Sequence, residues 1–255
     1  MIIVISPAKT LDFESKNSNL PMSKPRFLEK SQEIIDEIKN YNSYSLEKLM
    51  KISSKLATLN EERFSKWTKD LDTAKQCLLA FKGDVYRGMD VGSLSDSEIF
   101  YANEHLRILS GLYGVLRPLD GINEYRLEMG TKLKVKDSKD LYEFWDKELE
   151  ESILEELKEH KSKVLINLAS QEYFKAVEGL KNRNEIKVIT PIFKEYRGDK
   201  YKIIALNAKK ARGMMTRYII QNEIDDVSDI KKFNLEGYEF NEEMSNDIEY
   251  VFTRN

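Results

Sequence analysis

Cationic side chains on one expected helix carry the clearest chemistry in this sequence. The helix is predicted to begin near Asn207, and residues placed about 100° apart around it separate an apolar side from a basic side. The basic side holds Lys209, Lys210, Arg212 and Arg217. Gly213 falls within the basic arc, where the missing side chain allows a close backbone approach. This arrangement suits a nucleic-acid phosphate backbone. A solvated basic face with a tolerated glycine is the alternative.

The segment LSGLYGVLRPLD, residues 109–120, is a second candidate for phosphate contacts. It follows an expected helix, and Gly111 and Gly114 predict a tight turn before a second helix. This order resembles a helix-hairpin-helix, whose glycines expose backbone N–H groups to DNA phosphates. The glycines are spaced more widely than in the usual hairpin and Pro118 limits the second helix, so an ordinary interhelical turn is the alternative. The nearby cations are Arg107, Arg117 and Arg126.

The segment SPAKT offers a different chemistry. Ser6 and Lys9 have the Ser-x-x-Lys spacing of a serine nucleophile with a lysine base. No SDN or KTG motif accompanies them, and Ser6 followed by Pro7 also predicts an ordinary helix start. The segment FKGDVYRG is expected to form a strand and a turn whose charged residues line a cleft or form a surface ion pair. The resulting alternative small-molecule site comprises Ser6, Lys9, Lys82 and Asp84.

Charge is distributed unevenly along the chain. The net charge of −3 argues against a globally basic nucleic-acid binder. Residues 194–217, however, contain eight Lys or Arg and two acids, a local charge of +6, whereas residues 221–250 contain two Lys and ten acids, a local charge of −8. Such asymmetry can direct an anion to one face of a protein that is acidic as a whole. Two solvated surfaces of opposite charge are the alternative.

Ligands for transition metals are scarce. The chain has two histidines and one cysteine, and neither His105 nor His160 has a glutamate three residues before it. Cys77 lies in an apolar run, cannot form an internal disulfide and indicates a reducing compartment. We therefore predict no metal site and no cofactor. Direct iron handling by the acidic C-terminal segment is a weaker alternative.

These candidate residues depend on several predicted elements. Apolar and β-branched runs predict strands at residues 2–5, 164–168, 187–193 and 201–206, the last two joined as a hairpin around residues 197–199. Helical spacing covers residues 26–68, 95–109 and 141–157. Capping boxes are expected at Thr58 with Glu61 and at Ser95 with Glu98.

Interspersed strands and helices predict an α/β fold, with α+β as the other possibility. No linker, repeat or low-complexity stretch divides the chain, so we expect one compact domain over residues 1–255, with a mixed β-sheet flanked by helices. The N-terminal apolar run is too short for a signal peptide or a membrane span. We therefore expect a cytoplasmic protein with no membrane partner.

Taken together, several blocks resemble the peroxide stress protein YaaA family. They include SPAKTLD, AFKGDVYRG, HLRILSGLYGVLRPLD, INLASQEYF and KKARGMMTRYII, and they extend from residue 6 to residue 240 with YRLEMG, DLYEFW and FNLEGYEF. The resemblance implies a bacterial protein that protects cells during hydrogen peroxide stress. It also implies double-stranded DNA binding through a positive cleft and a helix-hairpin-helix, with links to recombinational repair and to lower free iron. The hairpin corresponds to residues 109–120 here. The cleft corresponds to Lys9, Lys82, Arg107, Arg126 and residues 209–217.

We predict a non-enzymatic protein that binds double-stranded or branched DNA with little sequence preference and needs no obligate protein partner. The competing hypothesis is an enzyme that acts on a phosphorylated or nucleotide-like small molecule in the same cleft. No motif specifies a reaction.

Overall fold

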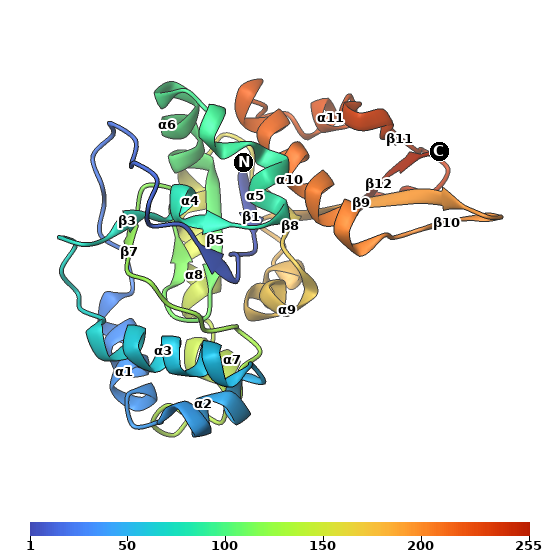
Figure 1. Ribbon diagram of the computed structural model, residues 1–255. Coiled ribbons are helices and arrows are strands. Elements are labelled where there is room, and N and C mark those ends of the chain that lie inside the picture. Colours follow the sequence, from blue (N-terminus) through green and yellow to red (C-terminus); the bar gives the residue numbers. More distant parts are fainter.

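A mixed β-sheet forms the centre of the protein. The computed structural model describes residues 1–255 (Figure 1). The main-sheet strands are β1 (Ile2–Ile5), β5 (Leu106–Ser110), β6 (Gly114–Leu116), β8 (Val164–Leu168), β9 (Lys187–Arg197), β10 (Lys200–Lys202), β11 (Glu239–Phe240) and β12 (Glu249–Arg254). Their order is β11-β12-β9-β8-β1-β5-β6, and β10 pairs with β9. Strands β5, β1, β8, β9 and β12 run parallel, whereas β6, β10 and β11 pair antiparallel with their neighbours. The predicted α/β class with a mixed sheet is confirmed.

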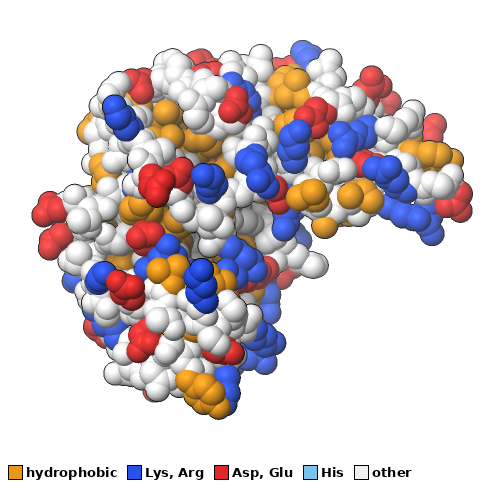
Figure 2. All heavy atoms as spheres, viewed as in Figure 1, with side chains coloured by type: hydrophobic (Ala, Val, Ile, Leu, Met, Phe, Trp, Pro, Cys, Tyr) orange, Lys and Arg blue, Asp and Glu red, His pale blue; other side chains and the backbone are white.

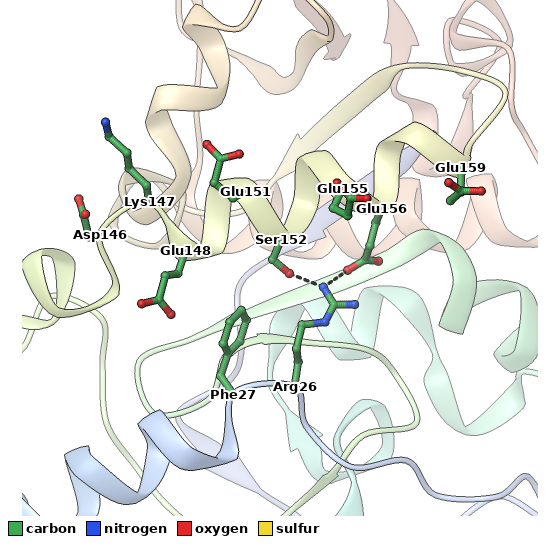
Figure 3. A pocket seen from close by; sticks show the side chains of 10 residues that line it. All are labelled: Arg26, Phe27, Asp146, Lys147, Glu148, Glu151, Ser152, Glu155, Glu156 and Glu159. Carbon is green, nitrogen blue, oxygen red and sulfur yellow. Dashed lines mark hydrogen bonds and ion pairs between the residues drawn. The ribbon is translucent and has the colours of Figure 1, made fainter.

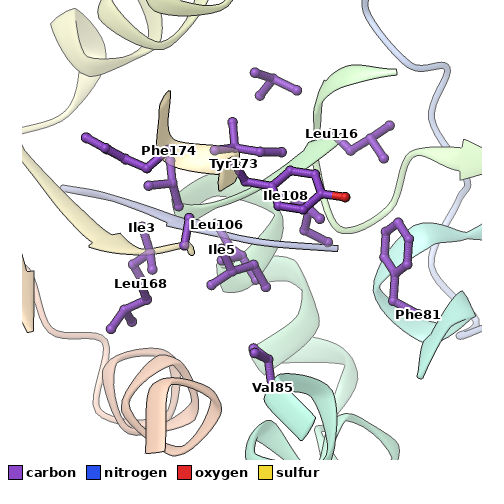
Figure 4. Close-up of a cluster of buried hydrophobic side chains, with 14 of the residues drawn as sticks. Ile3, Ile5, Phe81, Val85, Leu106, Ile108, Leu116, Leu168, Tyr173 and Phe174 are labelled. Atoms are coloured by element: carbon purple, nitrogen blue, oxygen red, sulfur yellow. The ribbon is translucent and has the colours of Figure 1, made fainter. Parts of the chain in front are cut away.

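Burial explains why the central strands read as continuous apolar runs. All four residues of β1 are inaccessible to solvent, as expected where both faces of a parallel sheet are covered. Figure 4 shows side chains of β1, β5, β6 and β8 meeting Phe81, Val85, Tyr173 and Phe174 from neighbouring segments. All but one of the buried apolar side chains form one continuous cluster.

Helices surround this sheet. They are α1 (Leu28–Ile38), α2 (Ser43–Met50), α3 (Ser54–Lys66), α4 (Cys77–Ala80), α5 (Asp84–Met89), α6 (Asp96–His105), α7 (Leu141–Trp145), α8 (Glu148–Glu159), α9 (Gln171–Phe174), α10 (Ala205–Gln221) and α11 (Val227–Ile230). Short 3-10 helices are η1 (Val91–Ser93), η2 (Lys175–Asn182) and η3 (Leu235–Gly237). The predicted capping box of Ser95 and Glu98 is confirmed at the start of α6. None of the helices combines the length and the apolar character needed to cross a bilayer.

Two small sheets and one projecting hairpin complete the fold. Strand β2 (Thr10–Leu11) pairs with β4 (Phe81–Lys82), and β3 (Lys75–Gln76) pairs with β7 (Gly121–Ile122). The β2–β4 pair brings the chain after β1 beside the start of α5. The β9–β10 hairpin, which we call the arm, extends away from the body of the molecule (Figure 1). Its turn contains Gly198 at φ 76°, so the predicted hairpin around residues 197–199 is confirmed.

The predicted helix-hairpin-helix is wrong. Helix α6 ends at His105, and residues 106–116 form the antiparallel β5–β6 hairpin. Its loop is closed by the pairing of Ser110 with Gly114, and Gly114 has the positive φ of 70° that a three-residue hairpin loop requires. The Ser110 hydroxyl accepts hydrogen bonds from the backbone N–H groups of Leu112 and Tyr113. The glycines therefore serve a strand turn.

Several local predictions also differ from the structure. No helix follows β1, and residues 81–88 form β4 and α5 rather than a strand and a turn. Ser53 caps α3 in place of the expected Thr58 box. The expected helix over residues 141–157 is divided into α7 and α8 at Asp146, whose φ is 41°. The expected strand over residues 201–206 is short because α10 begins at Ala205.

Candidate functional site

A pocket opens at the carboxyl ends of β1 and β8. From β1 the chain proceeds to the β5 side of the sheet, and from β8 it proceeds to β9 on the other side. Ligand sites in α/β sheets occur at such points, where the connections leave in opposite directions. Ser6 follows β1 and Ser170 follows β8. The Ser6 hydroxyl oxygen accepts from the Ser170 backbone N–H at 2.8 Å, and Ser6 Oγ donates to Ser170 Oγ at 3.2 Å.

This pocket joins residues that lie far apart in the sequence. Its volume is about 420 Å³. The pocket lining includes all four residues of the predicted small-molecule site, Ser6, Lys9, Lys82 and Asp84, and two residues of the predicted basic helix, Lys209 and Arg212. Strand pairing β2–β4 places the Lys9 region beside Lys82, and α10 supplies the opposite wall. Three groups of residues singled out in the sequence therefore meet at this pocket: those that follow β1, those around residue 83 and part of α10.

The Ser-x-x-Lys pair does not form a nucleophile and base. Lys9 Nζ lies 2.6 Å from a Glu128 carboxylate oxygen, and Arg126 binds the same carboxylate at 3.0 Å. Burial opposes ionisation of Glu128, but hydrogen bonds from both cations outweigh it and lower the pKa of Glu128. Lys9 is thus held by an ion pair, while Ser6 is hydrogen-bonded to Ser170.

Two further charges at the pocket are balanced by neighbours. Lys82 Nζ lies 3.6 Å from Asp12, and Asp84 pairs with Arg87. The Glu172 carboxylate, also in the lining, accepts a hydrogen bond from the Gly130 backbone N–H at 3.0 Å. Lys209 is exposed and takes part in no ion pair. The pocket therefore has an excess of positive charge that its carboxylates do not neutralise.

Gly213 packs against the protein itself. It is buried where α10 crosses α5, and a Cβ built there would lie 1.8 Å from the Val85 carbonyl oxygen. A Cβ at Gly88 of α5 would likewise lie 2.1 Å from the Lys210 carbonyl oxygen. The expected close backbone approach exists, but α5 is the partner. The prediction that Gly213 lies on the exposed basic side is wrong.

The basic side of α10 is also divided. Lys210 pairs with Glu236. Arg217 donates to the Met89 and Asp90 carbonyl oxygens at 2.8 and 2.9 Å and to Ser93 Oγ at 2.8 Å, so it binds the end of α5. Of the four cations predicted for this surface, only Lys209 and Arg212 line the pocket.

The other predicted DNA-binding residues lie away from the pocket. Arg107 is buried and bonds Glu156 at the amino end of the sheet. Arg117 binds the buried Asp120 at 2.9 Å. Gly111 and Gly114 are buried, the first against the Leu127 carbonyl and the second against Trp145 and Leu149. Burial prevents these glycines from reaching a phosphate, which is the physical reason that the hairpin assignment fails.

Comparison with known proteins places the chain in a family. A family model described as peroxide stress protein YaaA matches residues 1–244. The chain belongs to the peroxide stress protein YaaA family. It is 56% identical over 254 residues to a UPF0246 protein of Clostridium beijerinckii, with 100% of this chain and 98% of that protein covered. It is 48% identical over 256 residues to a UPF0246 protein of Hahella chejuensis, with 100% and 99% covered. Membership supports a role in peroxide stress.

In this member of the YaaA family, sequence reasoning missed the contribution of the segment after β8. Ser170, Glu172 and Tyr173 line the pocket but received no predicted role. Ser170 follows a buried strand just as Ser6 does, and adjacent parallel strands bring their carboxyl ends together. Knowing that β1 and β8 are neighbours would have identified this serine, but the strand order was not predicted.

A larger pocket has the opposite charge. It lies between α8 and the segment before α1, has a volume of about 640 Å³ and is lined mainly by carboxylates (Figure 3). Arg26 reaches across it to Ser152 and Glu156. Its glutamates would repel a phosphate. No group of three or more His, Cys, Asp or Glu side chains in the chain is arranged to hold a metal ion.

Proposed function

We propose that this YaaA family protein binds DNA, with little sequence preference, along the basic border formed by the arm and α10. The observation that carries the proposal is a group of cations with no ion-pair partner within the segment of local charge +6. The group consists of Lys194, Lys200, Lys202, Lys209 and Arg212. The remaining cations of this segment, Arg197, Lys210 and Arg217, are each paired with a carboxylate. Unpaired cations are available to replace the counterions of a phosphate backbone.

The shape of this surface supports the proposal. Figure 2 shows Lys and Arg side chains gathered over α5, α10 and the arm, above a hollow in the molecule. Asn207 at the start of α10 donates to Glu195 of β9 at 2.7 Å, which ties the two basic elements together. A line of cations beside a hollow can follow a nucleic-acid backbone and raise its association rate, even when the net charge is −3.

Aromatic side chains on the arm add a second kind of contact. Tyr196 and Tyr201 pair across the hairpin with ring centroids 5.3 Å apart, and Tyr196 is 47% exposed. A two-stranded ribbon with exposed aromatic and basic residues can contact a DNA groove or unpaired bases. No set of Asn, Gln and Arg side chains on one helix suggests base-edge recognition. The proposal therefore includes both double-stranded and branched DNA.

DNA binding also connects to peroxide stress through counterions. Ferrous iron held near phosphates would transfer an electron to hydrogen peroxide, giving ferric iron, hydroxide and a hydroxyl radical next to the bases. Lys and Arg that neutralise phosphates release the cations condensed there, and so would remove iron from the DNA surface. In this proposal the protein protects DNA by occupying its backbone and requires no catalytic step.

Titration of the protein with a fluorescent duplex and a four-way junction at several salt concentrations tests the proposal. Contacts with about four to six phosphates predict a slope of log K against log salt of roughly −4 to −5. Changing the arm cations Lys194, Lys200 and Lys202 together to Ala should weaken binding by on the order of tenfold or more, and should make the slope shallower by about 2 to 3.

A matched variant controls for total charge. Lys39, Lys51 and Lys55 are exposed, take part in no ion pair and lie on or between α1, α2 and α3, away from the arm (Figure 1). Their combined change to Ala removes the same charge and should leave affinity within about twofold. Equal losses in both variants, or a salt-independent titration, would refute binding at the arm.

A further inference from the structure

Arg212 is the only arginine of this chain without an ion pair. Every other arginine lies within 4.0 Å of a carboxylate oxygen, including the buried Arg107 with Glu156. Arg212 is partly buried in the pocket wall, and the one protein group that its guanidinium bonds is the Ala208 carbonyl oxygen, which accepts from Nε at 3.3 Å. Burial lowers the pKa of Arg212, with no carboxylate to oppose that effect. The two terminal nitrogens of the guanidinium have no partner in the chain.

Such a group is costly to keep. A partly desolvated charge without a counterion destabilises the folded state, and the close packing of Gly213 against Val85 fixes α10 so that the adjacent Arg212 stays at the pocket. Groups that reduce stability in a cleft are typical of binding sites, where the ligand supplies the missing partner. The missing partner here is an anion.

The rest of the lining defines the charge of that anion. Of the four cationic side chains that line the pocket, Lys9 and Lys82 are paired with carboxylates outside it, whereas Lys209 and Arg212 are unpaired. Two acidic side chains, Asp84 and Glu172, also line it. Both carboxylates already have partners outside it, Arg87 and the Gly130 N–H. The two unpaired cations match a phosphate monoester dianion better than a phosphodiester, which carries a single negative charge.

The pocket also provides neutral donors and room for an organic group. Ser170 Oγ accepts the hydrogen bond from Ser6 and so retains its own O–H for a ligand. Val85, Tyr86 and Tyr173 supply an apolar part of the lining. A volume of about 420 Å³ lies in the range of small-molecule sites.

We infer that the pocket at the carboxyl ends of β1 and β8 binds a phosphate monoester, with the Arg212 guanidinium as its principal contact and Lys209 and Ser170 beside it. The planar fork of an arginine fits two phosphate oxygens. The group can belong to a free phosphorylated small molecule or to the 5′-phosphate of a DNA end. The inference shares Lys209 and Arg212 with the proposed DNA surface but goes beyond it, and it can be tested separately because none of the arm cations Lys194, Lys200 and Lys202 lines the pocket.

Calorimetry and thermal unfolding with deoxyadenosine 5′-monophosphate, deoxyadenosine and short duplexes with and without 5′-phosphates test the inference. The wild type should bind the monophosphate and not the nucleoside. Arg212→Gln should weaken this binding at least tenfold and abolish the ligand-induced rise in Tm. If the 5′-phosphorylated duplex binds more tightly than both the unphosphorylated duplex and the monophosphate, the group belongs to a DNA end. The reverse order would assign it to a small molecule.

Arg183→Gln is the matched control, because Arg183 is a surface arginine that does not line the pocket and whose partner Glu151 does not line it either. It should keep affinity within about twofold. Arg212→Lys, which retains the charge without the fork, should be intermediate. The inference is overturned if neither phosphorylated probe binds the wild type, or if Arg212→Gln binds as tightly as the wild type while remaining folded. The arm variant should retain monophosphate binding, so failure of DNA binding and failure of this site are separable.

Discussion

Both ends of the parallel sheet carry cationic residues, but the two ends differ in whether the arginine there has a carboxylate partner. At the amino end, Arg107 Nε donates to Glu156 at 2.5 Å, and Arg26 binds the other oxygen of the same carboxylate at 2.5 Å. The Met1 ammonium group pairs with Asp225 at 3.0 Å. At the carboxyl end, Arg212 and Lys209 line a pocket without a carboxylate partner. The buried arginine at the amino end therefore has a carboxylate partner, whereas the arginine in the pocket at the carboxyl end has none.

This difference separates structural cations from binding cations. Sequence position alone does not distinguish Arg107 from Arg212, because both lie near glycines and apolar residues. Pairing distinguishes them: removing one partner of a buried ion pair destabilises the fold, whereas an unpaired cation in a cleft indicates a binding site. In open α/β sheets the carboxyl end is also where ligands bind.

The largest loss of stability is expected from disturbing the contact between α5 and α10, which holds the wall of the pocket at the carboxyl end of the sheet. Gly213→Ala puts a methyl group into the α5 backbone, since its Cβ would lie 1.8 Å from the Val85 carbonyl oxygen. We expect a loss of at least about 3 kcal/mol in the free energy of unfolding, measured by urea denaturation. Gly92→Ala is the control, because a Cβ there has no neighbour within 4 Å. A Gly213→Ala protein as stable as Gly92→Ala would contradict the structural role of this contact.

A paired substitution tests the comparison directly. Arg107→Gln leaves Glu156 partly buried with Arg26 as its only cation. We expect a loss of about 2 kcal/mol in unfolding free energy, less than for complete isolation of a buried carboxylate because Arg26 remains. Arg212→Gln removes a cation that has no carboxylate partner, so stability should change by less than about 0.5 kcal/mol or rise slightly. Equal losses of unfolding free energy for the two variants, measured by urea denaturation, would show that pairing does not separate structural cations from binding cations.

Much of the architecture could be predicted from local patterns. The β-branched run at residues 2–5 and the mainly apolar run at residues 164–168 predicted the two strands that frame the pocket, and the Ser95 capping box predicted the start of α6. These signals are local, because burial on both faces and helix capping act over a few residues. The local charge of +6 likewise identified the segment that forms the arm and α10.

The errors arose where distant segments determine the structure. Residues 106–110 are buried on both faces, so β5 has no alternation of polar and apolar residues to distinguish it from the helix before it. Helical periodicity located Gly213 on α10 but could not show that α5 lies against it. The ion pair of Arg107 with Glu156 joins residues 49 positions apart. Such pairings follow from strand order, which no local pattern specifies.

The smallest effect is expected from the titration of His160 at the amino end of the sheet. Burial, reinforced by the Met1 ammonium group and by the neighbouring His105 and Arg107, lowers the pKa of His160 from 6.5 to about 4, against the opposing charge of Glu156. The unfolded chain therefore binds a proton between about pH 6.5 and pH 4 that the folded protein excludes. Stability from this source is complete above pH 6.5 and is lost as the pH falls toward 4. Because His160 is partly exposed, we expect His160→Gln to reduce the loss of unfolding free energy between pH 7 and pH 4.5 by no more than about 1 kcal/mol. Carboxylates titrate equally in both proteins, so the difference between their urea-denaturation curves isolates the histidine, and parallel curves would show that the amino end accepts this proton without cost.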